Sequence, residues 1–247
     1  LPEEQISHYS LRAYPDPIVP PELIFEVTER VDYAGEVVTP LDEEEARILA
    51  RKLKRRGATT VAVCFINSYA NAQNERRMRE ILEEEVPEAS VSTSSDILPE
   101  IFEHDRFNTA VANTVLGPLV SDYVKQLDDE LSAGGYDNDL LLLHSGGGSM
   151  TPAMAKHFPV RLAASGIAAG AIAAKHIAEQ CGYQNAVGLD MGGTSTDISL
   201  IHDGELRVTK QWGVEYGHPI VFPSIEVLTV GAGGGSLAHI DIAGALR

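Results

Sequence analysis

Residues 188 to 200 read Gly188-Leu189-Asp190-Met191-Gly192-Gly193-Thr194-Ser195-Thr196-Asp197-Ile198-Ser199-Leu200, and this stretch decides the fold around it. Apolar residues alternate with polar or small ones on both sides of Gly192-Gly193-Thr194. This alternation is the period-two pattern of a half-buried β-strand, and the glycines in the middle are typical of a turn. The stretch therefore predicts a β-hairpin.

The register of this hairpin follows from the position of its turn. If the turn is centred between Gly193 and Thr194, the cross-strand pairs are Val187 with Leu200, Leu189 with Ile198, and Asp190 with Asp197. One face is then apolar and the other carries two carboxylates. Like charges placed opposite one another destabilise a sheet, so the aspartate pair implies a shared proton or a bound cation. The alternative is an ordinary hairpin with a solvated acidic face.

A magnesium ion carrying phosphates is a good candidate for that cation. Asp190 and Asp197 supply the oxygen ligands that Mg²⁺ prefers. The glycine turn exposes backbone N–H groups without side chains in the way, and the hydroxyls of Thr194, Ser195 and Thr196 lie alongside. The sequence thus predicts a phosphate and magnesium site at this turn.

Two further glycine runs are candidate sites. Gly146, Gly147 and Gly148 follow an apolar stretch at 140–143 that predicts a buried strand, and open α/β sheets place ligands at such strand ends. A flexible turn explains these glycines equally well, and His144 beside them is more typical of a structural residue than of a catalytic base. Gly233, Gly234 and Gly235 lie in a loop at 231–236 that must be approached closely by another segment or by a nucleotide.

The rest of the chain indicates alternating strands and helices. Asp42 and Glu45 have the spacing of a capping box, which begins a helix that ends before Gly57. Further helices are predicted at 74–85, 107–131, 151–157 and 167–180, and strands at 59–65, 89–93, 160–162 and 225–230. Residues 1–22 are too proline-rich for regular structure, and 212–223 are predicted to be irregular.

The amino-acid composition limits the classes of function that the chain could have. The chain has 247 residues, of which 44% are hydrophobic, and a formal net charge of -17. That charge argues against binding to nucleic acid or to an anionic membrane. No signal peptide or apolar run of membrane-spanning length is present, so we expect a cytoplasmic protein. Cys64 and Cys181 have no metal-binding spacing, and we expect both to be free, buried thiols.

The hairpin and its neighbours resemble the hydantoinase A and oxoprolinase family. The run from Asp190 to Asp197 is similar to the second phosphate motif of the actin, sugar-kinase and heat-shock ATPase fold, in the form that this family carries. Further family marks occur in order along nearly all of the chain: 26–31, 62–65, 68–71, 75–77, 98–100 with Glu103 and Arg106, Ser145 with Gly147-Gly148, and 229–236.

The resemblance implies a partial two-lobed α/β fold of the actin-like, ribonuclease H-like type. Residues 1–22 would be a lead-in, 23–165 the remainder of the first lobe with an insertion, and 166–247 a linking helix and the start of the second lobe. The first phosphate hairpin of the family has no match here, and the chain begins at Leu1, so we expect an internal fragment of a longer polypeptide that is inactive on its own.

The resemblance also implies chemistry. Family members use ATP to activate an unreactive carbonyl, which suggests a subunit of an ATP-dependent amidohydrolase acting on cyclic amides. An ATP-dependent acetone or acetophenone carboxylase subunit is the alternative, and a non-catalytic regulatory ATPase is a further one. The order of motifs argues against a sugar or acetate kinase. ATP and Mg²⁺ are the implied cofactors, Asp190 and Asp197 the implied catalytic and metal residues, and a hydantoinase B-like second subunit the implied partner in an oligomer.

Overall fold

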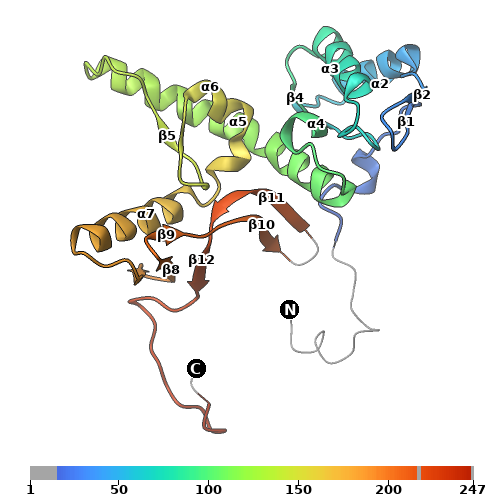
Figure 1. The fold of residues 1–247 in the computed structure, drawn as a ribbon. Helices are drawn as coiled ribbons and strands as arrows, with labels where there is room; N and C mark the ends of the chain where they lie inside the picture. Colours follow the sequence, from blue (N-terminus) through green and yellow to red (C-terminus); the bar gives the residue numbers. More distant parts are fainter. Residues whose placement is uncertain (1–15, 216–217, 246–247) are drawn as a thin grey trace. The chain divides into compact units, whose positions relative to one another are not determined.

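The computed structural model describes residues 16–215 and 218–245 and shows a mixed α/β protein (Figure 1). Its contacts divide the chain into two compact units. Unit 1 takes in the residues up to Leu142 together with Thr151–Val160 and Lys210–Phe222, and unit 2 takes in Leu143–Met150, Arg161–Thr209 and the residues from Pro223 on. The lobe boundaries predicted from the sequence, at 22/23 and 165/166, stay a prediction.

The described helices and strands follow in chain order. The α-helices are α2 (Glu43–Arg55), α3 (Gln73–Glu85), α4 (Ser94–Ile97), α5 (Glu103–Ala133), α6 (Pro152–His157) and α7 (Ser165–Gln180), and Pro21–Leu23 and Pro159–Leu162 form 3₁₀ turns. The strands are β1 (Arg30–Val31), β2 (Val37–Thr39), β3 (Thr60–Val63), β4 (Ser90–Thr93), β5 (Leu142–Leu143), β6 (Ser149–Met150), β7 (Ala186–Met191), β8 (Thr196–His202), β9 (Glu205–Leu206), β10 (Val208–Glu215), β11 (His218–Ile225) and β12 (Val227–Val230).

Helix α2 begins where the sequence predicts. The Asp42 side chain accepts a hydrogen bond of 3.0 Å from the backbone N–H of Glu45, which satisfies one of the unpaired N–H groups of the first turn. The Glu45 carboxylate does not complete a capping box. It accepts a 2.8 Å hydrogen bond from the N–H of Thr28 instead, so it ties the helix to the preceding strand region.

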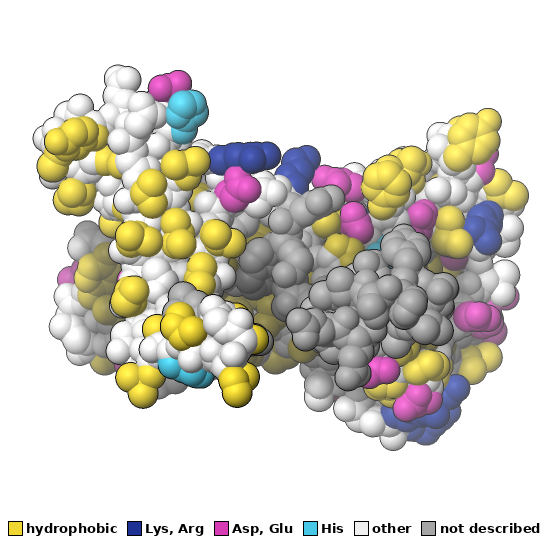
Figure 2. All heavy atoms as spheres, turned by 90° about the horizontal axis from the view of Figure 1, so that it is seen from below, with side chains coloured by type: hydrophobic (Ala, Val, Ile, Leu, Met, Phe, Trp, Pro, Cys, Tyr) yellow, Lys and Arg dark blue, Asp and Glu magenta, His cyan; other side chains and the backbone are white. Residues whose placement is uncertain are grey.

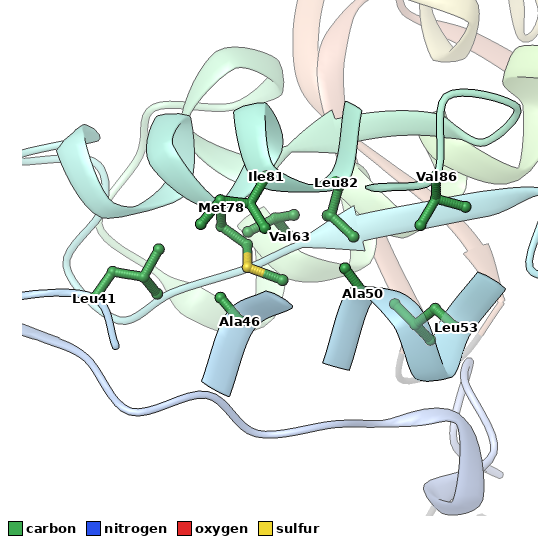
Figure 3. Packing of buried hydrophobic residues seen from close by; sticks show 9 residues of the cluster. All are labelled: Leu41, Ala46, Ala50, Leu53, Val63, Met78, Ile81, Leu82 and Val86. Atoms are coloured by element: carbon green, nitrogen blue, oxygen red, sulfur yellow. The ribbon is translucent and has the colours of Figure 1, made fainter. Parts of the chain in front are cut away.

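The core of unit 1 lies between two helices and a parallel strand pair. Strands β3 and β4 run parallel, with Thr60 opposite Ser90 and Val63 opposite Thr93, and they lie within the strands predicted at 59–65 and 89–93. Figure 3 shows the buried side chains converging between α2, α3 and β3. They are Leu41, Ala46, Ala50, Leu53, Val63, Met78, Ile81, Leu82 and Val86. Burial of this apolar surface is the main favourable term for unit 1.

A buried charged cluster joins the same strands to α5. Glu75 and Arg106 are both fully buried, and the hydroxyl of Ser94 bonds to both: it donates to Glu75 Oε1 over 2.6 Å and accepts from Arg106 Nε over 3.1 Å. Arg106 also donates to the carbonyls of Glu100 and Phe65, and Glu75 accepts from the N–H groups of Phe65 and Ser95. Because a buried charge is tolerated only when it is hydrogen-bonded, these family marks fix the structure of unit 1.

Unit 2 is built on an antiparallel sheet. Its strand order is β12-β8-β7, with β9 paired to the far end of β8. The β7–β8 register pairs Val187 with Leu200, Leu189 with Ile198, and Asp190 with Asp197, so the predicted hairpin register is confirmed.

Helix α7 covers the carboxylate-bearing face of this sheet. Strand β7 and helix α7 approach each other closely at Gly188, where an added Cβ would lie 2.8 Å from the Cβ of Ala174. The opposite, apolar face stays uncovered by the described residues: Leu189 is 70% exposed, and Val187, Met191, Leu200 and Leu228 are exposed too. Hydrophobic side chains gather at the surface on the left of Figure 2. The alternation of residues in the hairpin predicts that its large apolar side chains form the buried face. In the structure, the face that packs against α7 is instead the one where small residues of β7 and α7 meet.

Several sequence predictions are wrong. Residues 140–143 do not form a buried strand, because β5 is a two-residue strand that pairs with β6 and Leu141 is exposed. Residues 160–162 belong to a 3₁₀ turn, and 212–223 contain most of the β10–β11 pair. Residues 1–15 of the predicted lead-in lie outside the described residues.

The two cysteines differ. Cys64 is half-buried at the end of β3, and desolvation of its sulfur, together with the nearby Glu75 carboxylate, raises the pKa of its thiol. Cys181 is exposed because it caps the C-terminus of α7, so the prediction of a buried thiol is wrong there. In the described part of the chain, no helix is long and apolar enough to cross a membrane.

Leu82→Ala tests the core of unit 1. Leu82 is a fully buried residue of α3 in the core cluster, so its truncation leaves a cavity and we expect the free energy of unfolding to fall by about 2–5 kcal/mol. Leu119→Ala, at a position of α5 that is 69% exposed, is the matched control and should change it by less than about 0.5 kcal/mol. Denaturant titration of both variants makes the comparison, and equal effects would contradict the assigned core.

Candidate functional site

The candidate site lies in unit 2, where β7, β8 and β12 place three polar side chains in one row. Asp190 on β7 is opposite Asp197 on β8, and Asp197 is opposite Thr229 on β12. The Thr229 hydroxyl donates a 2.5 Å hydrogen bond to Asp197 Oδ1. On the other side of the row, an added Cβ at Gly170 of α7 would lie 3.3 Å from Asp190 Oδ2. The two predicted metal-binding carboxylates are therefore together on one face of the sheet.

The turn of the hairpin is braced by the third glycine loop. The N–H of Gly234 donates to the carbonyl of Gly192 over 2.9 Å, and the N–H of Gly235 donates to the carbonyl of Gly193 over 3.0 Å. The hydroxyl of Thr196 donates to the carbonyl of Ala232 over 2.6 Å. Three hydrogen bonds thus hold the loop at 231–236 against the turn.

These bonds also orient the amides of the turn. In a planar trans peptide the N–H lies opposite to the C=O, and the described residues contain no cis peptide bond. Since the carbonyls of Gly192 and Gly193 are directed to the loop, the N–H groups of Gly193 and Thr194 are directed away from it. Successive N–H groups directed to the same side form an anion-binding concavity.

Gly233 is the point of closest approach. An added Cβ there would lie 2.7 Å from the carbonyl oxygen of Gly192 and 2.7 Å from the nitrogen of Thr194. Its own N–H bonds to the Ser236 hydroxyl over 3.0 Å. Of the two explanations for this loop, another segment or a nucleotide, the structure shows the first. The predicted role of Gly233, Gly234 and Gly235 as phosphate ligands stays a prediction, and their amides are engaged within the protein.

The predicted hydroxyl ligands differ in their environment. Thr194 is exposed beside the turn and Ser195 is half-buried, whereas Thr196 is buried under the loop that its hydroxyl contacts. The carbonyl of Ser195 closes the turn by accepting a 2.9 Å hydrogen bond from the N–H of Gly192. Thr194 and Ser195 are thus better placed than Thr196 to contact a ligand.

The second glycine run forms the connection between β5 and β6. Gly147 has a φ of +87°, which favours glycine, and its N–H donates to the carbonyl of His144 over 2.9 Å. The N–H of Gly146 donates to His144 Nδ1 over 3.0 Å, so the neutral ring carries its proton on Nε2. Burial and the nearby Arg161 lower the pKa of His144. Gly146, Gly147 and Gly148 therefore wrap around a histidine, and their contact with a ligand stays a prediction.

Ser145 has a structural role that the sequence analysis did not predict. It is fully buried, its hydroxyl and its N–H both donate to the carbonyl of Arg161, at 2.7 and 2.8 Å, and its carbonyl accepts from the N–H of Ile225 at 2.8 Å. These contacts join the β5–β6 connection to the 3₁₀ turn at Pro159–Leu162 and to the end of β11. No local signal predicts these three hydrogen bonds, because both partner residues, Arg161 and Ile225, are distant from Ser145 in sequence.

The two carboxylates of this row supply too few ligands for a magnesium ion by themselves, and oxygens of a bound phosphate would have to complete the site. Among residues 16–215 and 218–245, no group of three or more His, Cys, Asp or Glu side chains is arranged to hold a metal ion. Mg²⁺ is commonly bound by one or two carboxylates together with substrate phosphates and water. Two opposed aspartates fit this pattern, because a phosphate held by the amides of Gly193 and Thr194 would supply the remaining oxygen ligands.

A mixed α/β fold with a carboxylate pair beside a braced glycine turn defines a candidate anion-binding protein. The sequence matches the hydantoinase/oxoprolinase family model over residues 106–247 and the model of the hydantoinase/oxoprolinase N-terminal region over residues 2–86. The chain belongs to the hydantoinase/oxoprolinase family.

Individual relatives agree with this assignment. The acetophenone carboxylase gamma subunit of Aromatoleum aromaticum is 34% identical over 245 residues, which cover 93% of this chain and 32% of that one. A nucleotide-free structure of acetone carboxylase, from work on ATP-dependent acetone carboxylation, matches with a TM-score of 0.81 and 31% identity over 99% of this chain and 35% of that one. The ATP-dependent caprolactamase of Pseudomonas jessenii matches with a TM-score of 0.79 and 29% identity, over 87% and 31%. The chain thus spans about a third of the length of these relatives.

The pKa of His144 tests the β5–β6 connection. Because folding favours the neutral ring, we expect His144 to titrate below its ordinary value of 6.5 in NMR spectra of the ring protons. Its stabilising contribution is then present above pH 6.5 and is lost as the pH falls through the lowered pKa. Arg161→Met removes one of the two causes and should move the pKa upward. A His144 pKa at or above 6.5 would contradict the environment described.

Gly233→Ala tests the brace. The added methyl group meets backbone atoms at 2.7 Å, so we expect the loop to separate from the turn at a cost of about 1–3 kcal/mol. Hydrogen exchange at the amides of Gly234 and Gly235 should become faster. Gly231→Ala is the matched control, since an added Cβ there meets nothing within 4 Å. Equal exchange in both variants would show that the close approach does not hold the loop.

Proposed function

We propose that this chain forms the phosphate-binding part of an ATP-dependent enzyme that activates a carbonyl group by phosphorylation. The observation that carries the proposal is the pairing of Asp190 and Asp197 beside a turn whose Gly193 and Thr194 amides are directed away from the loop. An anionic ligand needs such local donors, because the chain as a whole has a net charge of -17.

Each residue has a distinct role in this proposal. The amides of Gly193 and Thr194 donate to phosphate oxygens, with the Thr194 and Ser195 hydroxyls beside them. Asp190 and Asp197 would hold a magnesium ion, directly or through water, and such an ion would supply positive charge to offset the negative charge of the phosphates. In phosphoryl transfer the protein mainly positions groups and neutralises charge, so catalysis depends on how rigidly these groups are held.

The proposal extends to the fold. The β7–β8 hairpin with α7 would be the start of the second lobe, residues 166–247, of an actin-like ATPase fold, and 23–165 the remainder of the first. Nucleotide would then close between two lobes, each contributing one phosphate hairpin. The short span relative to the relatives supports a full protein with further segments.

Hydrolysis of a cyclic amide is the reaction we favour. An amide is resistant to attack because its carbonyl is weakly electrophilic, and phosphorylation of the oxygen turns it into a leaving group. The relation to a caprolactamase supports this reaction. Carboxylation of a ketone is the second candidate, and the relations to acetophenone and acetone carboxylase subunits support it equally. Both reactions need the same phosphate site.

We also propose a second, hydantoinase B-like subunit. Relatives named as carboxylase gamma and beta subunits and as a caprolactamase subunit alpha support an assembly of several chains. If the site only regulates such an assembly, nucleotide would change the association of the subunits without being hydrolysed. Turnover that depends on substrate separates the enzyme from this regulator.

Asp190→Asn in the full-length protein with its partner subunit tests the function. We expect wild type to hydrolyse ATP faster when hydantoin, oxoproline, acetone or acetophenone is added, and the stimulating compound identifies the reaction. Loss of the carboxylate charge should lower this rate by about 100-fold or more. The matched control is Asp203→Asn, at the exposed turn after β8. If Asp190→Asn turns over like wild type, the hairpin is structural and the proposal is wrong.

A further inference from the structure

Thr229 is the hydrogen-bond donor in the carboxylate row, and the backbone pairing of β8 with β12 does not involve its side chain. Its hydroxyl reaches Asp197 Oδ1 at 2.5 Å across the β8–β12 pair, at the surface of the molecule. A hydrogen bond at the surface competes with hydrogen bonds to water, so its net contribution to stability is small. The bond therefore does little for folding, and its effect falls on the orientation of the Asp197 carboxylate.

That orientation matters because Asp190 faces Asp197 from the neighbouring strand. Two carboxylates in opposed positions repel each other, and each can rotate about its side-chain bonds to increase the separation. Thr229 lies on the far side of β8 from Asp190. By holding Oδ1, it fixes one rotamer of Asp197 and leaves Oδ2 available. Asp190 keeps its own place because Gly170 has no side chain to fill the space beside Asp190 Oδ2.

The same strand end also controls the amides of the turn. Thr229 is followed directly by Val230 and by the loop at 231–236, whose Gly234 and Gly235 bond to the turn. One short segment thus holds the carboxylate through a side chain and the turn through its backbone. Loss of the hydroxyl removes only the first of these contacts.

We propose that Thr229 is a positioning residue that holds Asp197 ready for the magnesium ion that accompanies a bound nucleotide. This inference rests on the proposed function. If the Thr229 hydroxyl is removed, we expect the contribution of magnesium to nucleotide affinity to fall. The contribution of the turn amides to that affinity should stay the same. Partners that orient metal ligands typically change metal affinity by about 10–100-fold when removed.

The test measures nucleotide affinity and not turnover. The dissociation constant of ADP is determined for the full-length protein with Mg²⁺ and again with EDTA, and the ratio of the two is the magnesium gain. Thr229→Val keeps the shape of the side chain and removes the donor, so we expect the magnesium gain to fall about 10-fold while the affinity in EDTA is unchanged. Thr229→Ser keeps the donor and should retain the gain.

Val230→Thr is the matched control, because it makes the reverse exchange at the next residue of β12, on the opposite face of the strand. It should leave the magnesium gain as in wild type. Thr229→Ala repeats the test without the β-branched shape if Thr229→Val does not fold. A magnesium gain that stays at the wild-type level in Thr229→Val or Thr229→Ala overturns the inference.

Asp197→Asn separates this inference from the proposed function. If it abolishes the magnesium gain while Thr229→Val does not, the metal site stands and only the role of Thr229 is wrong. If Asp197→Asn leaves the gain unchanged, or wild type does not bind ADP, the proposed function is wrong and the inference with it.

Discussion

The contact between Gly233 and the hairpin turn is the constraint on which the candidate site depends. Backbone meets backbone there at a distance that excludes even a Cβ, and the loop can then satisfy the Gly192 and Gly193 carbonyls. Because a peptide group is rigid, satisfying its carbonyl on one side presents its N–H on the other. The side of the turn that we propose binds an anion is therefore shaped by packing on the opposite side, without a charged side chain.

The hairpin was predictable because its information is local. Alternation and the two glycines give the strands and the turn, and counting from the turn gives the register that places Asp190 opposite Asp197. The identity of the covered face was not predictable in this way. Large apolar residues on β7 and β8 indicate a buried face, but the helix packs where Gly188 and Ala174 allow close approach. Which face is covered depends on the position of α7, and the sequence of the strands does not determine that position.

Other features of the sequence depend on contacts between distant residues. The family marks at Glu75 and Arg106 become intelligible only when Ser94, which bonds to both, lies between them. The apolar run at 140–143 fails as a buried strand because its partner is the short strand β6, which leaves little for it to pack against. Likewise, the role of the loop at 231–236 was open between a nucleotide and the protein itself until the hydrogen bonds to the turn were known.

The different environments of the two cysteines allow one of them to be labelled selectively with a spectroscopic probe. A thiolate is the species that reacts with maleimide or iodoacetamide reagents, and the raised pKa of Cys64 keeps that thiol protonated at neutral pH. Cys181 is exposed at the end of α7, the helix whose Gly170 adjoins Asp190. A fluorophore or spin label attached to the unaltered sequence would therefore select Cys181 over Cys64, and would report on the helix that lines the carboxylate row.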